Sequence, residues 1–294
     1  MDYIPAKHLL HRSKSTSWFG TDHTMNLYRG CCHGCLYCDS RSACYQNPDF
    51  DRVKAKADAL RLLRDDLARK AKPAFITMGS MSDPYNPFEE ELQLTRHALE
   101  LIDAYRCGVA AATKSDLIVR DIDLYRLIQD HSSVICKLTV TTTDDALAAK
   151  IEPHAPPPSR RLRALEELAK AGIFSGVLLM PVLPYVDDLV ENVLSVVDSA
   201  ARAGARFVYA AFGVTMRDGQ RDYFLDGLDR AFPGMGERYR KRYGFRYYCS
   251  SPRAKELWEL FSSRCRELGL LYEMRHIISA ATRSYEDRQL SFFD

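Results

Sequence analysis

The chain has 294 residues, of which 46% are hydrophobic and 27% charged, and its 41 basic and 39 acidic residues leave a net charge of +2. This composition is ordinary for a globular protein and excludes a wholly disordered chain. Nucleic-acid binding, if present, would rest on a local basic patch rather than on the whole surface. No apolar run is long enough to span a membrane, and the N-terminus lacks the apolar stretch of a secretory signal. We therefore expect a cytoplasmic protein with no membrane partner.

Short apolar runs alternate with longer amphipathic segments after an N-terminal extension over residues 1–22. The apolar runs predict β-strands over residues 23–29, 74–80, 108–113, 134–143, 174–182 and 205–212. The segments between them have apolar residues at helical spacing and predict helices over residues 52–70, 88–105, 120–130, 159–172 and 187–203. Gly108, Gly172 and Gly204 each stand just before a predicted strand, where left-handed C-caps that end helices occur.

Repeated strand–helix–strand units predict right-handed crossovers and a parallel sheet. Six units are too few to close an eight-fold barrel, so the sequence predicts an α/β fold with a partial (β/α)6 TIM-like barrel over residues 23–215. A basic, aromatic-rich stretch and a helix over residues 252–268 follow. They predict a small, mainly helical C-terminal appendage over residues 216–294 that ends in a flexible tail.

Unusual residues follow several of the predicted strands. A cysteine-rich loop follows the first strand, residues 79–84 follow the second, Thr113 and Lys114 end the third, and threonines lie on the fourth. Because chemistry gathers at the carboxyl ends of parallel strands, this coincidence predicts one shared active site.

The nine cysteines are an odd number in a chain expected in a reducing compartment, so a disulfide framework is not expected. Cys31, Cys35 and Cys38 form a C-x3-C-x2-C set, and thiolates suit zinc or iron–sulfur clusters. Three cysteines on one loop favour a cubane held at three irons, whose fourth iron stays open. The alternative is a zinc knuckle completed by Cys44 or His33. Cys32 lies in the same stretch, and the four cysteines outside it are predicted to fill the core: Cys107, Cys136, Cys249 and Cys265.

The cysteine set after a first strand, with Tyr37 just before its last member, resembles the radical S-adenosyl-L-methionine (SAM) superfamily. The strings NLYRGCCHGCLYCDSR, MGSMSDPYNPFE, TRHALELI, TKSDLIVRD and IEPHAPP resemble the spore photoproduct lyase-like branch, also called DNA repair photolyase-like, over roughly residues 24–215. The resemblance implies a 4Fe-4S cluster on Cys31, Cys35 and Cys38, with the methionyl amino and carboxylate groups of SAM on the fourth iron. It also implies a one-electron reductant of the flavodoxin or ferredoxin type, whose electron releases a 5′-deoxyadenosyl radical that abstracts hydrogen from substrate.

The resemblance also implies contacts with SAM. Tyr37 takes the position where the superfamily stacks an aromatic near the adenine, and Ser80 and Asp83 lie where relatives contact the amino group or the ribose. Lys114 ends an otherwise apolar strand, where a lysine needs an anion such as the methionyl carboxylate. The alternatives are a core tyrosine, a simple Ser-Asp-Pro turn and a surface lysine.

A polar face is expected on the fourth predicted strand, where Thr139, Thr141 and Thr143 alternate with other residues. Central parallel strands are normally apolar on both faces, so these hydroxyls are predicted to line the cofactor pocket. Arg161, which opens the helix over residues 159–172, is a further candidate partner for the SAM carboxylate, or else a solvated helix residue.

One position departs from the family pattern. Spore photoproduct lyases return a hydrogen atom to the substrate from a cysteine that aligns here with Ser80. A hydroxyl O–H bond is much stronger than a thiol S–H bond, so serine does not readily replace that donor. Thymine-dimer lyase activity therefore does not follow from the resemblance, although Cys32 is another thiol near the cluster loop.

Residues 238–248 combine five cations with five aromatic residues, a mixture that single-stranded or flipped-base nucleic-acid binding uses. The alternative is a solvated helix with buried tyrosines. The candidate contacts are Arg238, Arg240, Lys241, Arg242, Tyr243 and Arg246.

The C-terminal stretch Gln289–Phe293 resembles the short peptide that docks on the bacterial sliding clamp, although such a tail can also dock on its own barrel. Taken together, the sequence predicts a radical SAM enzyme that acts on a nucleic acid in repair or modification. The alternatives are a radical SAM enzyme for a peptide, nucleoside or other small molecule, and a zinc-binding, non-catalytic nucleic-acid adaptor.

Overall fold

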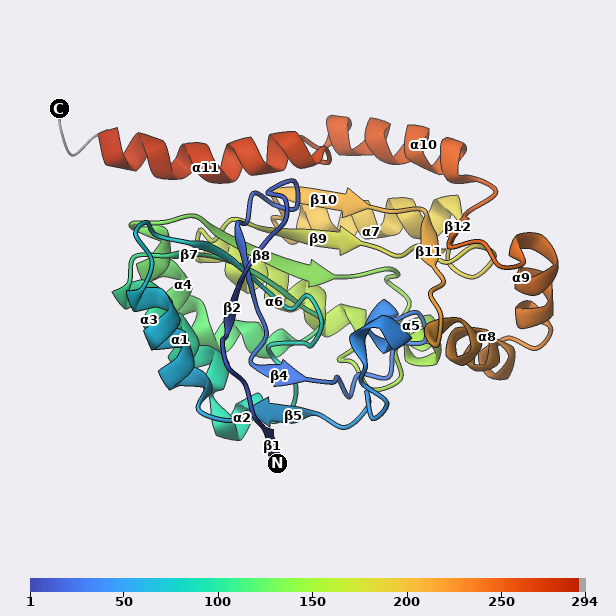
Figure 1. Cartoon of the computed structure of the whole chain (residues 1–294). Helices are drawn as coiled ribbons and strands as arrows, with labels where there is room; N and C mark the ends of the chain where they lie inside the picture. Colours follow the sequence, from blue (N-terminus) through green and yellow to red (C-terminus); the bar gives the residue numbers. More distant parts are fainter. Residues whose placement is uncertain (291–294) are drawn as a thin grey trace.

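The computed structural model describes the backbone of residues 1–290 and the side chains of residues 1–282. Its central sheet has seven strands: β2 (Leu10–Arg12), β3 (His23–Met25), β6 (Phe75–Met78), β7 (Gly108–Thr113), β8 (Val134–Thr139), β9 (Ser175–Leu179) and β10 (Phe207–Ala210). Their order is β10-β9-β8-β7-β6-β3-β2, and all neighbours are parallel except the antiparallel β2 and β3. The six parallel strands confirm the predicted partial barrel (Figure 1).

Five helices cover the outer face of this sheet: α1 (Ala59–Ala68), α3 (Leu94–Ala104), α4 (Ile122–Gln129), α6 (Pro158–Lys170) and α7 (Val190–Arg202). Their apolar stripes pack against the outward side chains of the strands, such as Cys136 and Leu138 of β8. The helical spacing of apolar residues in the sequence predicted these stripes, because an amphipathic helix buries its apolar face. All four cysteines predicted to fill the core are buried, as expected: Cys107, Cys136, Cys249 and Cys265.

The N-terminal residues belong to the folded body. β2 extends the central sheet, and β1 (Asp2–Ile4) joins β4 (Tyr28–Arg29) and β5 (Lys54–Lys56) in a small sheet of order β1-β5-β4. Three 3-10 helices and two short α-helices occupy the connections: Asp39–Arg41, Ala43–Tyr45, Asp116–Asp121, α2 (Glu89–Leu92) and α5 (Asp145–Ile151). The predicted N-terminal extension is therefore part of the sheets rather than a separate arm.

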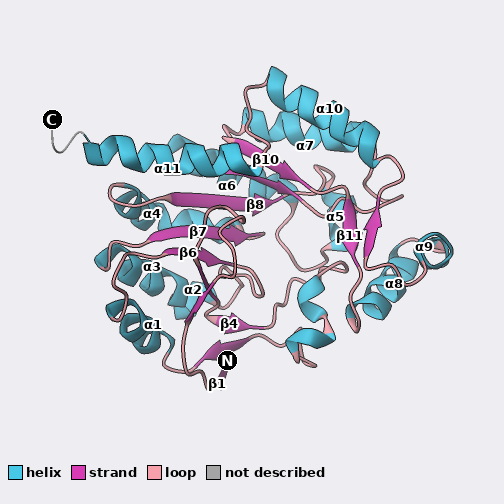
Figure 2. Cartoon of the chain, turned by 45° about the horizontal axis from the view of Figure 1, so that its top comes forward, coloured by secondary structure: helices cyan, strands magenta, loops and turns pink. Residues whose placement is uncertain are grey.

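The C-terminal part follows β11 (Gly213–Thr215) and contains α8 (Gln220–Ala231), α9 (Met235–Tyr243), β12 (Tyr248–Ser250), α10 (Ala254–Glu267) and α11 (Met274–Leu290). Figure 2 shows α10 beside α7, and Leu257 and Phe261 of α10 belong to the main core. Phe224 of α8 and Tyr239 of α9 pack in a second core with Cys35 of the cysteine loop. The appendage thus shares its cores with the barrel. No helix in the described part of the chain is both long and apolar enough to cross a membrane.

Several element boundaries differ from the prediction. The helix expected over residues 52–70 begins only at Ala59, because the preceding residues form β5 and pair with β1. The helix expected over residues 88–105 is divided at Gln93, which has a φ of 49°. β8 ends at Thr139, so the threonines that follow lie in the loop and not on one strand face.

The glycine prediction holds at two of three positions. Gly172 and Gly204 have φ values of 76° and 78°, as expected of left-handed C-caps. Gly108 instead begins β7, where a Cβ would come within 2.8 Å of the carbonyl oxygen of Ser133. Arg106 takes the positive φ, 53°, at the end of that helix. Close approach of neighbouring backbones explains the glycine at position 108.

An inner layer of aromatic side chains fills the end of the barrel opposite the loops. Phe19 and Phe207 lie with ring centroids 5.6 Å apart, and Ile135 of β8 packs with them. Trp18, from the segment between β2 and β3, contacts Tyr209 of β10 edge-on at 5.5 Å. The two margins of the open sheet are therefore connected by side chains and not by strand pairing.

Candidate active site

A cavity of about 460 Å³ lies at the carboxyl ends of the barrel strands. This volume is typical of a small-molecule or cofactor site. The cavity collects the cysteine loop and the ends of β6, β7 and β8, so the predicted convergence at one edge is present. The predicted site residues that line it are Cys31, Cys35, Cys38, Tyr37, Ser80, Asp83, Lys114 and Thr139.

Two glycines let the cysteine loop turn tightly. Gly30 has a φ of 83°, and a Cβ there would lie 2.6 Å from the carbonyl oxygen of Phe50. Gly34 has a φ of 68°, and a Cβ would lie 2.9 Å from the ring of His154. L-residues rarely adopt these conformations, so the glycines set how the three cysteines face the cavity. The amide of Cys31 donates to Phe50, which fixes the start of the loop.

The three thiols form a donor set that fits an iron–sulfur cluster. Burial raises the pKa of Cys31, and the charges of Asp83 and Cys35 raise it further. Burial also raises the pKa of Cys35 to about 12, although Lys114 opposes this shift. Mutually repelling thiolates in a buried site need cationic iron beside them, and cluster binding releases their protons. Among residues 1–282, no group of three or more His, Cys, Asp or Glu side chains is close enough to hold a single metal ion, so a zinc knuckle gains no support.

Asp83 joins the cysteine loop to two strands. Its carboxylate accepts hydrogen bonds from His33 Nε2 at 3.0 Å, the Lys114 amide at 2.9 Å, Thr113 Oγ1 at 2.6 Å and the Tyr85 amide at 2.9 Å. Both of its oxygens are therefore engaged within the protein, and Asp83 positions the loop and the end of β7. Burial opposes the charge of this carboxylate, but His33 and the other donors lower its pKa to about 2. His33 was considered from the sequence only as a zinc ligand.

Replacing Asp83 with asparagine is expected to remove an acid-sensitive part of the stability. The pKa of Asp83 falls from an ordinary 3.8 to about 2 on folding, so its ionised form stabilises the fold above pH ~4, and this contribution is lost as the pH falls towards 2. We expect Asp83→Asn to cost about 2 kcal/mol at pH 7 and progressively less below pH ~4. Urea unfolding across this pH range measures it. The exposed Glu259→Gln serves as control, and a cost for Asp83→Asn that does not vary with pH would contradict the assignment.

A buried ionic network lies behind the cysteine loop. The hydroxyl of Tyr37 donates to Glu152, and Arg161 forms an ion pair with the same carboxylate at 2.5 Å. The Nζ of Lys114 lies 5.3 Å from the centre of the Tyr37 ring. Burial opposes the charge of Lys114, but Cys35 and Glu152 raise its pKa, so its ammonium group remains available to an anion in the cavity. Glu152 was not identified from the sequence, because nothing in the local pattern distinguishes it from a surface glutamate.

Three residues predicted to line the cofactor pocket or to contact SAM lie outside the cavity lining: Arg161, Thr141 and Thr143. Arg161 is fully buried, and besides Glu152 it donates to the carbonyl oxygens of Thr139 at 2.9 Å and Pro156 at 2.6 Å. Its guanidinium is therefore occupied, and it holds Glu152 in place rather than reaching a carboxylate in the cavity. Thr141 is buried beyond the end of β8 and likewise does not line the cavity. Thr143 is hydrogen-bonded to Ser195 of α7 at 2.7 Å.

Neither Ser80 nor Cys32 places a second thiol beside the three cysteines in the cavity lining. Ser80 lines the cavity at its exposed rim, where Asn26 Nδ2 donates to its hydroxyl at 3.3 Å. Cys32 packs against the main core and does not line the cavity. Among the described residues, the cysteines that line the cavity are therefore Cys31, Cys35 and Cys38 alone.

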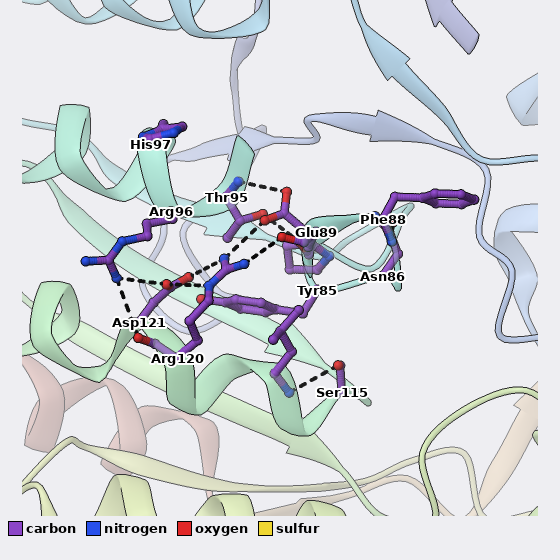
Figure 3. A network of polar contacts seen from close by, with 12 residues as sticks. Tyr85, Asn86, Phe88, Glu89, Thr95, Arg96, His97, Ser115, Arg120 and Asp121 are labelled. Carbon is purple, nitrogen blue, oxygen red and sulfur yellow. Dashed lines mark hydrogen bonds and ion pairs between the residues drawn. The ribbon is translucent and has the colours of Figure 1, made fainter. Parts of the chain in front are cut away.

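The loop that carries Asp83 is anchored from outside the barrel (Figure 3). Arg120 pairs with the buried Glu89 at 3.2 Å and with Asp121 at 2.8 Å, and Arg96 also reaches Asp121 at 3.1 Å. The hydroxyl of Tyr28 donates to Glu89, so β4 is part of the same network. These contacts fix the segment from the end of β6 to α3, and hence the position of Asp83.

The basic stretch over residues 238–248 divides into an inner and an outer part. Tyr243 is buried and its hydroxyl donates to the carbonyl oxygen of Ser250, so the prediction that it contacts nucleic acid is wrong. Arg238 stacks on the ring of Tyr185, and Arg240 lies 3.4 Å from both Asp226 and Asp229. The helical period turns Tyr239 and Tyr243 towards the second core, whereas Arg238 and Arg240 remain exposed. Of the predicted contacts, the exposed ones outside these pairings are Lys241, Arg242 and Arg246.

An exposed group of aromatic and cationic residues lies next to the cavity, and we call it the rim patch. Phe245 is 96% exposed, and Tyr247 and Tyr248 are also exposed. Two half-buried arginines lie beside these rings. Arg221 is 5.7 Å from the Phe245 ring and donates to the carbonyl oxygens of Gly244, Met216 and Arg246. Arg217 is 5.5 Å from the Tyr247 ring and pairs with Asp39 at 3.5 Å, so Arg246 is the exposed cation of the group. Tyr248 also lines the cavity, which makes the patch continuous with it. The rim patch comprises Arg217, Arg221, Phe245, Arg246, Tyr247 and Tyr248. The predicted clamp-binding stretch at the C-terminus lies outside the residues whose side chains are described.

Comparison with known protein families decides the identity of this site. The family model described as the radical SAM superfamily matches residues 25–213. The chain belongs to the radical SAM superfamily. This confirms the predicted family, and with it a 4Fe-4S cluster and SAM as cofactors and an enzymatic function. Cys31, Cys35 and Cys38 lie within the range that matches the radical SAM model, and they line the cavity.

The chain is also similar to known proteins in sequence and in fold. An uncharacterized protein of Mycobacterium tuberculosis is 31% identical over 228 residues, which cover 75% of this chain and 67% of that protein. An uncharacterized protein of Methanocaldococcus jannaschii is 32% identical over 170 residues, covering 58% of this chain and 64% of that one. Spore photoproduct lyase in complex with dinucleoside spore photoproduct has the same fold, with a TM-score of 0.68 and 15% identity over 92% of this chain and 81% of its own. The methyltransferase TsrM of Kitasatospora setae, with cobalamin and a 4Fe-4S cluster, has a TM-score of 0.57 and 11% identity over 91% and 61%.

Proposed function

We propose that this radical SAM enzyme abstracts hydrogen from a nucleic acid, in repair or modification. The observation that carries the proposal is the rim patch, which joins exposed aromatic rings and arginines to the mouth of the cavity. Base–aromatic stacking contributes about 1–3 kcal/mol per base and tolerates any sequence, while arginines attract phosphates. The solved relative in complex with a dinucleoside photoproduct gives the proposal further support.

The residues of the cavity have distinct parts in this function. When bound, the cluster and SAM supply a 5′-deoxyadenosyl radical. Cys31, Cys35 and Cys38 hold the cluster, and the ammonium group of Lys114 faces the cavity as a partner for the carboxylate of SAM. Asp83 fixes the cysteine loop against β7, and Tyr37 with Glu152 closes the wall behind it. The apolar barrel interior excludes water from the reacting groups.

A deuterium-transfer experiment tests the choice of substrate. The reconstituted, reduced enzyme is incubated with SAM and with damaged or intact, deuterated DNA and RNA oligonucleotides, and the 5′-deoxyadenosine formed is analysed by mass spectrometry. Deuterium in 5′-deoxyadenosine from at least one oligonucleotide supports the proposal. Formation of 5′-deoxyadenosine without deuterium from any of them would direct the search to peptides, nucleosides and other small molecules.

Variants of the rim patch test where nucleic acid binds. We expect the combined Phe245→Ala and Arg246→Ala substitutions to weaken binding of single-stranded DNA by roughly tenfold or more, because they remove one stacking surface and one phosphate contact. Fluorescence anisotropy with a labelled oligonucleotide measures the affinity. Phe88→Ala, which removes an exposed aromatic outside the cavity lining, is the matched control and leaves the affinity unchanged. Equal affinities for all three proteins would contradict the placement of the binding surface.

A further inference from the structure

A buried lysine lies inside the barrel, below the cofactor residues. Lys137 is on β8, two residues before Thr139, which corresponds to about 7 Å further into the barrel. Its side chain is 1% exposed and lines the inner part of the cavity. Its partners in the sheet are Ala112 of β7 and Gly176 of β9, so the smallest side chains flank it. Lys137 therefore lies at the floor of the cavity, where Phe207 fills the space beside Gly176 and the Phe19 ring lies against the amine.

The amine of Lys137 has no hydrogen-bond partner among the described residues. The contact found for it is with the face of the Phe19 ring, whose centre is 4.4 Å from Nζ. Burial lowers the pKa of Lys137 to about 7, and the neighbouring Cys136 only partly offsets this. A buried polar group without a partner costs free energy, and methionine would fill this position without that cost. The amine itself has almost no accessible surface, so to meet a partner that enters through the cavity it has to turn away from the Phe19 ring.

The walls above Lys137 restrict what that partner can be. Trp18, Leu178, Met180 and Tyr248 line the cavity between the floor and the rim, and they present flat or apolar surfaces. The other charged residues of the lining, Asp39, Asp83 and Lys114, belong to segments that follow the strands β4, β6 and β7. The hydroxyls of Thr77 and Thr139 also line the cavity, and that of Thr77 already donates to the carbonyl oxygen of Ala110. A flat ring that carries an acceptor oxygen on its leading edge matches these flat or apolar surfaces and the unpaired amine at the floor.

Resting on the proposed function, we propose that Lys137 donates a hydrogen bond to a keto oxygen of a nucleobase that is turned out of its strand and inserted edge-first into the cavity. The rim patch holds the flanking strand, and the cavity floor selects the base. Thymine, uracil, guanine and cytosine carry such an oxygen, whereas adenine does not. Lys137 is thereby a specificity-determining residue, and the enzyme discriminates against adenine at the inserted position.

The experiment compares two bases of the same shape. One short DNA strand is abasic except for a central thymine, and a second carries the nonpolar isostere 2,4-difluorotoluene, which lacks the keto oxygens, at that position. Binding to the cluster-containing enzyme with SAM, in the absence of reductant, is measured by fluorescence anisotropy. We expect the thymine strand to bind roughly tenfold more tightly than the isostere strand. Lys137→Met removes this preference, while Arg246→Ala weakens binding of both strands by the same factor.

Each outcome separates the inference from the function on which it rests. A Lys137→Met enzyme that folds and retains the preference overturns the role of Lys137, as does a wild-type enzyme that binds both strands equally. The melting temperature of Lys137→Met is expected to equal or exceed that of the wild type, since an unpaired buried amine is removed. A large decrease would show that the lysine is structural and would also overturn the inference. If neither strand nor any other oligonucleotide binds, the proposed function itself fails.

Discussion

Cys35→Ala is expected to abolish the iron–sulfur cluster and all cleavage of SAM, whereas Cys32→Ala is expected to leave both in place. The two residues are neighbours in one loop, but Cys35 lines the cavity and Cys32 packs against the main core. Loss of one cysteine leaves only two thiolates to hold the cluster, because Cys31, Cys35 and Cys38 are the cysteines that line the cavity. Iron and sulfide content after anaerobic reconstitution, the brown colour of the protein and the yield of 5′-deoxyadenosine with dithionite measure the effect.

Cys32→Ala is the matched control for this experiment because it removes a thiol from the same loop. Dependence of cluster assembly on Cys32 would show that the ligand assignment to Cys31, Cys35 and Cys38 is wrong. A colourless protein that retains one zinc ion per chain would instead favour the zinc adaptor, and the same variants would then identify its ligands.

Glu152→Gln and Arg161→Met are each expected to reduce the free energy of unfolding by about 3–5 kcal/mol. Both side chains are almost completely buried, at 1% and 0% exposure, so removing either charge leaves the other buried without its ion-pair partner. Burial opposes the charge of Glu152, but Arg161 and Lys114 together lower its pKa, which shows that it is held as a carboxylate. Urea unfolding of the cluster-free proteins at neutral pH measures the loss.

The double variant and a neighbouring arginine provide the controls. Glu152→Gln combined with Arg161→Met is expected to cost less than the sum of the single substitutions, because neither partner is left charged and buried. Arg160→Met changes the adjacent residue on α6, whose side chain is 52% exposed and pairs with Asp116 at 2.7 Å. Such an exposed ion pair contributes at most about 1 kcal/mol. Equal effects at positions 160 and 161 would contradict the importance assigned to the buried network.

The barrel could be predicted from the sequence because the patterns that indicate its strands and helices are local and recur along the chain. Apolar runs and amphipathic helices alternate regularly, and chain chirality then leaves few ways to connect them. The boundaries failed where tertiary structure decided them. Residues 54–56 form strand β5 because β1 pairs with them. The threonines after position 139 lie outside β8 because its pairing with β9 ends at Thr139.

The site could be predicted only where a residue type is unusual in its position. Three closely spaced cysteines and a lysine at the end of an apolar strand stand out in any sequence, and the structure places Cys31, Cys35, Cys38 and Lys114 around one cavity. Glu152, by contrast, owes its place to Arg161 and Tyr37 from other elements, which no local pattern reveals. Tyr243 was predicted to contact nucleic acid but is buried, because packing against α8 decides which side of α9 faces the core.

The central sheet is open and not closed into a complete barrel, and this affects the width of the cavity inside it. Ladder hydrogen bonds set the spacing between neighbouring strands. Across the gap between the margins, Trp18 contacts Tyr209 and Phe19 contacts Phe207 through their rings, and Ile277 and Ala281 of α11 pack in the same cluster. The width of the cavity between the two margins therefore depends on the volume of the side chains that meet there. Exchanging one ring for a smaller or larger side chain there would narrow or widen the space above Lys137 while every strand kept its partner.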